Sequence, residues 1–290
     1  MKYLFIIIFF IFQIMSLKSE EVLKKVHDEA KLNTDNKGPL NEFKAFNNYC
    51  KVFSSHNGGF TRTLISTDYG NTWEVEFSSQ FISSGTQIIS SINGDFNDGM
   101  TVVGLNVGYL YFQKKVGNDY DLIKTPSNYA IRKVQIFKND IYFYDLRTLF
   151  VSKDSCKTFD TVATMDGYNF TSFFIINDST FFIATNNYIE VNVPYFFLTK
   201  DKGKNWIKIK GFEKQFHKLF FLDSIGWALS YLPTGLGDQK RDVVYKTYNY
   251  GIDWEKIYDN ANEPYIMGLA DIDFKDNLNG IATGNWGKVL

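Results

Sequence analysis

Ser66-Thr67-Asp68-Tyr69-Gly70-Asn71-Thr72-Trp73 stands between two β-rich runs, residues 62–65 and 74–77. The short Asp at its third position can accept hydrogen bonds from the N–H groups of a turn. The Gly at its fifth position can adopt the positive φ that a tight reversal requires. The Ser and Thr hydroxyls can bond back to the loop, and the closing Trp brings a large surface to bury. The octet therefore predicts a hairpin turn held by its own side chains, which we call a bracing turn.

The octet recurs along the chain. Its copies begin at positions 66, 113, 152, 199 and 247, so the steps between them are 47, 39, 47 and 48 residues. Three copies depart from the pattern, with Lys115 and Asn249 at the Asp position and Cys156 at the Gly position, and less regular turns are expected there. The residues assigned to bracing turns are Ser66, Asp68, Gly70, Thr72, Trp73, Ser152, Asp154, Thr158, Phe159, Thr199, Asp201, Gly203, Trp206, Thr247, Asn249, Gly251 and Trp254.

The spacing of the copies predicts the fold. A period of roughly 40–50 residues that contains strands indicates the blades of a β-propeller or a similar array. Each repeat divides into four short strands with the bracing turn between the third and the fourth, as in residues 218–222, 226–231, 243–247 and 254–258. We therefore predict an all-β chain, a β-propeller of four-stranded antiparallel blades. A sixth repeat begins at residues 268–274, so six blades are favoured, or seven if the sequence is part of a longer chain.

The beginning of the chain predicts export. One basic residue and an apolar run over residues 3–15 are typical of a signal peptide, which we place at residues 1–19. An uncleaved anchor is the alternative, although the run is shorter than the roughly 20 residues of a membrane span. Residues 20–42 are assigned to a linker or a strand that closes the ring, with a short helix as a further alternative, and residues 43–290 to the propeller. A secreted, periplasmic or cell-envelope location is expected.

Composition limits the partners. The net charge of −1 gives no reason to expect nucleic acid or an anionic membrane surface as a partner. An even number of cysteines permits a disulfide in an exported protein. However, Cys50 and Cys156 lie in different repeats, so free thiols are expected. The three histidines, His27, His56 and His217, have no partner at metal-ligand spacing. We therefore predict a monomer with no metal and no cofactor.

The bracing turn resembles the Asp-box, or bacterial neuraminidase repeat, of sialidases, sortilin-type receptors and other exported propellers. Residues 271–287 resemble the photosystem II stability and assembly factor propellers. The resemblance covers about residues 43–290 and implies that the turns are structural and lie away from the ligand face. It also implies that a sialidase would need three arginines on one carboxylate. This chain has four in all, Arg62, Arg132, Arg147 and Arg241.

Three classes of function follow from these observations. The favoured one is an exported, non-enzymatic propeller that binds a protein or another macromolecule and acts as an assembly-factor-like scaffold. A sialidase-type glycoside hydrolase is one alternative, and a surface adhesion or structural module is the other. Two insertions, residues 186–194 and 232–241, are the candidate binding loops, because long loops on a rigid scaffold often carry binding residues.

Overall fold

The computed structural model consists of two compact units, residues 1–134 and 135–290, each of which is described by itself. The signal peptide and residues 20–39 lie outside the described residues, as do Gly70 and the start of the third strand expected at residues 287–290. The structure describes residues 40–46, 49–55, 60–68, 72–80, 91–94, 100–105, 108–189, 193–210, 216–233, 240–260, 268–274 and 276–284.

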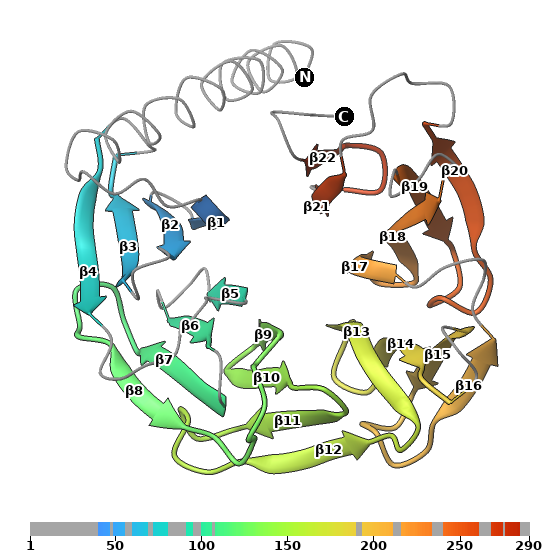
Figure 1. The fold of residues 1–290 in the computed structure, drawn as a ribbon, viewed down its shortest axis with the longest axis horizontal. Coiled ribbons are helices and arrows are strands. Elements are labelled where there is room, and N and C mark those ends of the chain that lie inside the picture. The colour runs from blue at the N-terminus through green and yellow to red at the C-terminus, as the bar shows by residue number, and fades with distance from the viewer. Residues whose placement is uncertain are drawn as a thin grey trace, which may run out of the picture. The chain divides into compact units, whose positions relative to one another are not determined.

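The first unit contains two sheets of four antiparallel strands in chain order (Figure 1). The first sheet begins at Leu40 and pairs each strand with the next through consecutive hairpins. The strands of the first sheet are β1 (Leu40–Phe46), β2 (Tyr49–Ser55), β3 (Phe60–Ser66) and β4 (Glu74–Gln80). The strands of the second sheet are β5 (Ser91–Gly94), β6 (Thr101–Gly104), β7 (Tyr109–Gln113) and β8 (Asp121–Lys124).

The second unit contains three further sheets of the same order and one sheet of two described strands. The third sheet has β9 (Lys133–Phe137), β10 (Asp140–Tyr144), β11 (Thr148–Ser152) and β12 (Asp160–Thr164). The fourth has β13 (Tyr168–Ile175), β14 (Phe181–Asn187), β15 (Val193–Thr199) and β16 (Ile207–Lys210). The fifth has β17 (Phe216–Leu222), β18 (Ile225–Pro233), β19 (Lys240–Thr247) and β20 (Glu255–Asp259), and the two-stranded sheet has β21 (Leu269–Phe274) and β22 (Gly280–Gly284).

The predicted all-β class and the four-stranded antiparallel repeat are confirmed. The strands form where short runs of Val, Ile, Phe and Tyr stand between turn residues, because β-branched and aromatic side chains pack well on a pleated surface. The bracing turn joins the third strand of a sheet to the fourth in all five four-stranded sheets. The number of blades stays a prediction.

Aromatic side chains fill the space between neighbouring sheets of the second unit. Tyr142 and Tyr144 of the third sheet pack with Phe173 and Phe181 of the fourth, and all four are buried. Phe182 and Phe196 of the fourth sheet pack in the same way against the fifth. The fourth sheet therefore buries both of its faces, and its two ends are left as the places where polar side chains can meet a ligand.

Candidate functional site

The bracing turns share one hydrogen-bond pattern. In the turn of the fourth sheet, the Thr199 hydroxyl donates to Asp201 Oδ1 over 2.7 Å and accepts the Gly203 amide over 3.0 Å. The backbone and side chain of Asn205 donate to the same carboxylate, over 2.9 and 2.7 Å. The turns that begin at Ser66 and Ser152 hold their third-position carboxylate in the same way, with a Thr at the seventh position as donor.

Two of the three departures from the octet leave this pattern intact. Cys156 occupies the glycine position with φ of 63°, and its amide still donates to Ser152 Oγ over 2.9 Å. Asn249 accepts the Thr247 hydroxyl and the Asp253 amide as an Asp would, and its own side-chain N–H donates to Asp253 Oδ2. Where Asn249 replaces Asp at the third position, Asp253 therefore supplies an acceptor at the seventh position, which holds a donor in the turns of the third and fourth sheets. The expectation of less regular turns is wrong at these two positions.

The carboxylates of the bracing turns are occupied by their own turns. Asp154 belongs to the third sheet and Asp201 to the fourth, and donors of the turn lower the pKa of each to about 2. For Asp154 the chief donor is Thr158, and for Asp201 it is Asn205. Hydrogen bonds to the ionised form explain the direction of the shift. A carboxylate held in this way supports the turn and has little capacity left for proton transfer.

The low pKa of Asp201 predicts how its contribution depends on pH. A depressed folded-state pKa gives stability that is present above the usual value of 3.8 and is lost as the pH falls toward about 2. The difference in melting temperature between the wild-type protein and Asp201→Ala should therefore narrow over this range. The control is Phe182→Ala, because a buried ring with no ionisable group gains no proton there. If the difference in melting temperature from the wild type narrowed equally in both variants, the lowered pKa assigned to Asp201 would be contradicted.

The end of the sheets opposite the bracing turns, which we call the distal end, carries the exposed side chains of interest. In the second unit, Arg147 lies between β10 and β11, and Tyr188 and Ile189 follow β14. Arg147 Nη1 donates to the Tyr188 hydroxyl over 3.3 Å, and its guanidinium carbon lies 5.8 Å from the centre of the ring. Tyr188 is 48% exposed and Ile189 is 71% exposed. These three residues form the distal patch.

Buried polar groups fix the backbone beneath the distal patch. The side chain of Asp145 accepts the amides of Arg147 and Thr148, each over 3.0 Å. The Arg147 carbonyl accepts the Met165 amide, and the Gly167 carbonyl accepts the Tyr188 amide. Gly167 has φ of 86° and lies directly under the Ile189 side chain. The distal patch is therefore carried by a rigid support, which is how binding residues on loops are kept in place.

A second polar cluster lies at the distal end of the fifth sheet. The rings of His217 and Tyr231 stack with their centres 4.0 Å apart, and both side chains reach the Leu269 carbonyl. Asp242 is fully buried and accepts the Leu269 amide over 2.7 Å. Burial, together with the charge of Asp242, raises the pKa of Tyr231. The cluster thus ties β21 to β17, β18 and β19.

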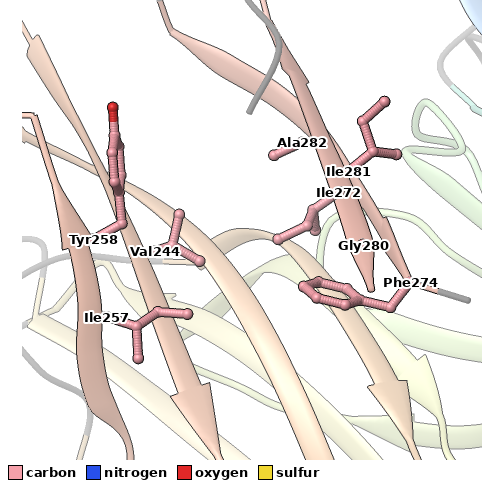
Figure 2. Close-up of a pocket in the computed structure, with 8 residues that line it drawn as sticks. All are labelled: Val244, Ile257, Tyr258, Ile272, Phe274, Gly280, Ile281 and Ala282. Atoms are coloured by element: carbon pink, nitrogen blue, oxygen red, sulfur yellow. The ribbon is translucent and has the colours of Figure 1, made fainter. Parts of the chain in front are cut away.

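An apolar groove of about 210 Å³ lies between the fifth sheet and the two-stranded sheet (Figure 2). Within the described residues, β21 and β22 have no third strand beside them, and Ile257 is 48% exposed. The Tyr258 hydroxyl apart, the side chains of the lining are apolar, so the groove offers nothing to hold a charged ligand. The groove is lined by Val244, Ile257, Tyr258, Ile272, Phe274, Gly280, Ile281 and Ala282.

The arginines of the second unit have separate partners. Arg147 contacts Tyr188, while Arg241 lies 3.4 Å from the Asp259 carboxylate. The side chain of Arg62 lies outside the described part of the chain. Among the described residues, no group of three or more His, Cys, Asp or Glu side chains is placed to hold a metal ion. Cys156 is a free, buried thiol, and burial raises its pKa to about 12.

Comparison with known proteins identifies the class of fold. No family model and no curated protein matches the chain. The chain is similar to YCF48 bound to D1 peptide, at 14% identity and a TM-score of 0.63, over 87% of this chain and 78% of that one. It is also similar to the GH74 xyloglucanase from Xanthomonas campestris, at 13% identity and 0.65, over 88% of this chain but only 45% of that one. The WD40 β-propeller domain of Doa1 matches at 13% identity and 0.52, over 87% and 91%.

At these identities, the shared feature is the fold. The chain is therefore a β-propeller, and the predicted resemblance to the photosystem II assembly factor propellers is confirmed at the level of the fold. The described residues include no apolar helix of the length needed to cross a membrane.

Sequence reasoning found the bracing turns but missed the distal patch. The sequence places Arg147 and Tyr188 41 residues apart, and neither belongs to a motif. Tyr188 and Ile189 do fall in the insertion at residues 186–194, which was one of the two candidate binding loops. The length of that loop was therefore the only signal in the sequence. That Arg147 lies beside the loop is decided by the tertiary structure.

Proposed function

We propose that this chain is an exported, non-enzymatic β-propeller that binds a protein partner through the distal end of its second unit. The observation that carries the proposal is the distal patch, in which an exposed Tyr and Ile stand beside an Arg on a rigid support. Tyr and Arg are enriched among the residues that contribute most to protein interfaces. The apolar run at residues 3–15 supports export.

Similar propellers support a protein as the partner. One of the similar structures is YCF48 bound to D1 peptide, and another is a WD40 domain. The bracing turns hold their own carboxylates, so the end of the sheets that carries them offers fewer free groups. The distal patch has both apolar area and a hydrogen-bonding cation, a combination that suits a protein surface better than a small polar ligand.

The test compares equivalent side chains at the two ends of the sheets. Partners captured from the cell envelope by cross-linking would be identified and their affinities measured by calorimetry. Tyr188→Ala and Ile189→Ser should each weaken binding by about tenfold or more. Tyr248→Ala and Ile252→Ser are the matched controls, because these residues are exposed at a bracing turn. They should leave the affinity unchanged.

The opposite result would place the binding surface elsewhere. If the Tyr248 and Ile252 variants weakened binding while the Tyr188 and Ile189 variants did not, the ligand would lie on the bracing turns. Loss of export on replacing Ile7 and Ile8 with Asp would test the location separately, because charges in the apolar run disable a signal peptide.

A glycoside hydrolase is the second candidate, favoured by the similarity to the GH74 xyloglucanase. Such an enzyme would use a pair of carboxylates on opposite sides of the scissile bond. In the second unit, the buried carboxylates of Asp145 and Asp242 at the distal end are engaged by backbone amides. Assays with a sialoside and with xyloglucan test this candidate, and turnover that Tyr188→Ala leaves unchanged would favour it over the scaffold.

A further inference from the structure

A lysine is buried between the two sheets of the first unit. Lys51 of β2 is 0% exposed, and its ammonium group makes an ion pair with Glu76 of β4 over 2.9 Å. The same group donates to the hydroxyls of Thr101 and Tyr120, each over 3.1 Å, and to Gln113 Oε1. A buried ammonium is costly unless its charge is paired and its protons are bonded. Here both conditions are met.

The partners of Lys51 also bond to each other. The Glu76 carboxylate accepts Gln113 Nε2 over 2.9 Å and the Tyr120 hydroxyl over 3.0 Å. Gln113 Nε2 also donates to the Asn118 carbonyl over 2.8 Å. Burial lowers the pKa of Lys51, and the charge of Glu76 acts in the opposite direction. Lys51 and Glu76 come from the first sheet, and Gln113 and Tyr120 come from the second, so the cluster joins the two sheets.

The positions that form this cluster hold other residue types in the second unit. Lys51 is the residue of the second strand that pairs with Ile65, just before the bracing turn. By the same register its equivalents are Tyr142, Phe182 and Trp227. Each of these aromatic rings packs against an aromatic ring of the next sheet. The first sheet thus has a cation where the third, fourth and fifth sheets have a ring.

The positions of Glu76, Gln113 and Tyr120, the partners of Lys51, also hold other residue types in other sheets. Glu76 is the extra residue where the register of β3 and β4 shifts, and its equivalents at such shifts are Val162 and Ile257. Gln113 and Tyr120 occupy the first and last positions of the second bracing turn. Elsewhere these positions hold Ser or Thr and Trp or Phe. At the contact between the first and the second sheet, both sheets therefore depart from the residue types of the other repeats. These unusual residues form their hydrogen bonds with one another.

We propose that Lys51, Glu76, Gln113 and Tyr120 form a polar key that makes the first sheet pack against the second sheet and against no other. The repeats resemble one another, so an apolar face of one sheet can pack against several others during folding, and repeat proteins misassemble in this way. The face that carries Lys51 cannot be buried against rings such as Trp254 or Phe274, because they offer no acceptor for its protons. A buried polar group that fixes register is the best-attested use of such a cluster.

The experiment removes the two charges singly and together in the full-length protein. Lys51→Met leaves the Glu76 carboxylate buried without its cation and should lower the melting temperature by roughly 5–10 °C. Lys51→Met combined with Glu76→Leu removes both charges and should regain most of that loss. The double variant should nevertheless refold from urea with a lower yield of the single native species, measured by elution volume and near-ultraviolet circular dichroism.

The matched control is an exposed pair between two other sheets. Lys138 and Asp178 form an ion pair in which both side chains are more than 60% exposed. Lys138→Met combined with Asp178→Asn should change neither the melting temperature nor the refolding yield. The proposal is overturned if Lys51→Met leaves the melting temperature unchanged, or if the double variant refolds as completely as the wild type. A double variant that does not fold would overturn it as well, because the charges would then serve stability itself.

Discussion

Phe182→Ala is expected to lower the free energy of unfolding by about 3–5 kcal/mol, the range for removing a buried aromatic ring from a core. Phe182 is 0% exposed, and its ring lies within 6 Å of three others, with centres 5.4 Å from Phe196, 5.5 Å from Phe221 and 5.8 Å from Trp254. Trp254 is the last residue of the bracing turn of the fifth sheet, so the Phe182 ring packs between the fourth and the fifth sheet. Its loss leaves a cavity that the three neighbouring aromatic residues cannot easily fill.

Gly251 makes this contact possible. A Cβ atom at Gly251 would lie 2.3 Å from Cε2 of Phe182, and the glycine has φ of 84°. Because Gly251 has no side chain, the backbone of the bracing turn can lie in contact with the Phe182 ring. Urea unfolding monitored by circular dichroism gives the free energy, and Ile207→Ala is the control because Ile207 is 53% exposed. The control should stay within about 1 kcal/mol of the wild type. Equal losses in the two variants would show that the ring contributes nothing beyond an exposed side chain.

Asp242→Ala should lower the free energy of unfolding by about 2–3 kcal/mol, because hydrogen bonds to a charged group are strong and their donors are left buried. The Asp242 carboxylate accepts the Leu269 amide over 2.7 Å and is 3.5 Å from Asn260 Nδ2. Leu269 is the first residue of β21. The variant should thus loosen the two-stranded sheet, and hydrogen exchange at the Leu269 amide should accelerate.

The control for this prediction is Asp259→Ala. Asp259 pairs with Arg241 and Lys256 at a partly exposed position, where ion pairs contribute at most about 1 kcal/mol. Hydrogen exchange at Leu269 should be unaffected in this variant. Protection of the Leu269 amide that survives in Asp242→Ala would contradict the role given to the buried carboxylate.

Much of the fold could be predicted because its causes are local. The bracing turn is closed by bonds between residues two and four positions apart, such as Thr199 with Asp201 and Asp201 with Asn205. A turn of this kind can be recognised from eight consecutive residues. The effect of the departures from the octet was misjudged because each position was compared with the pattern by itself. Asn249 is compensated by Asp253, and such a comparison does not consider the two residues together.

The candidate site could be predicted only in part. The insertion that carries Tyr188 was visible as a longer loop, but its partner Arg147 belongs to the preceding repeat. The export signal and the number of blades remain predictions. The distal patch and the polar key each depend on side chains from different sheets, which no spacing in the sequence brings together.

The sequence by itself determined the repeating unit of this protein, since strand alternation and the bracing turn arise from interactions within a few residues. Only the tertiary structure decided which faces meet. Lys51 lies 62 residues from Gln113 and 69 from Tyr120, and its burial depends on packing between sheets. The physical reason is that local hydrogen bonds are encoded in neighbouring residues, whereas the pairing of buried charges and rings is settled only when separately formed sheets come into contact.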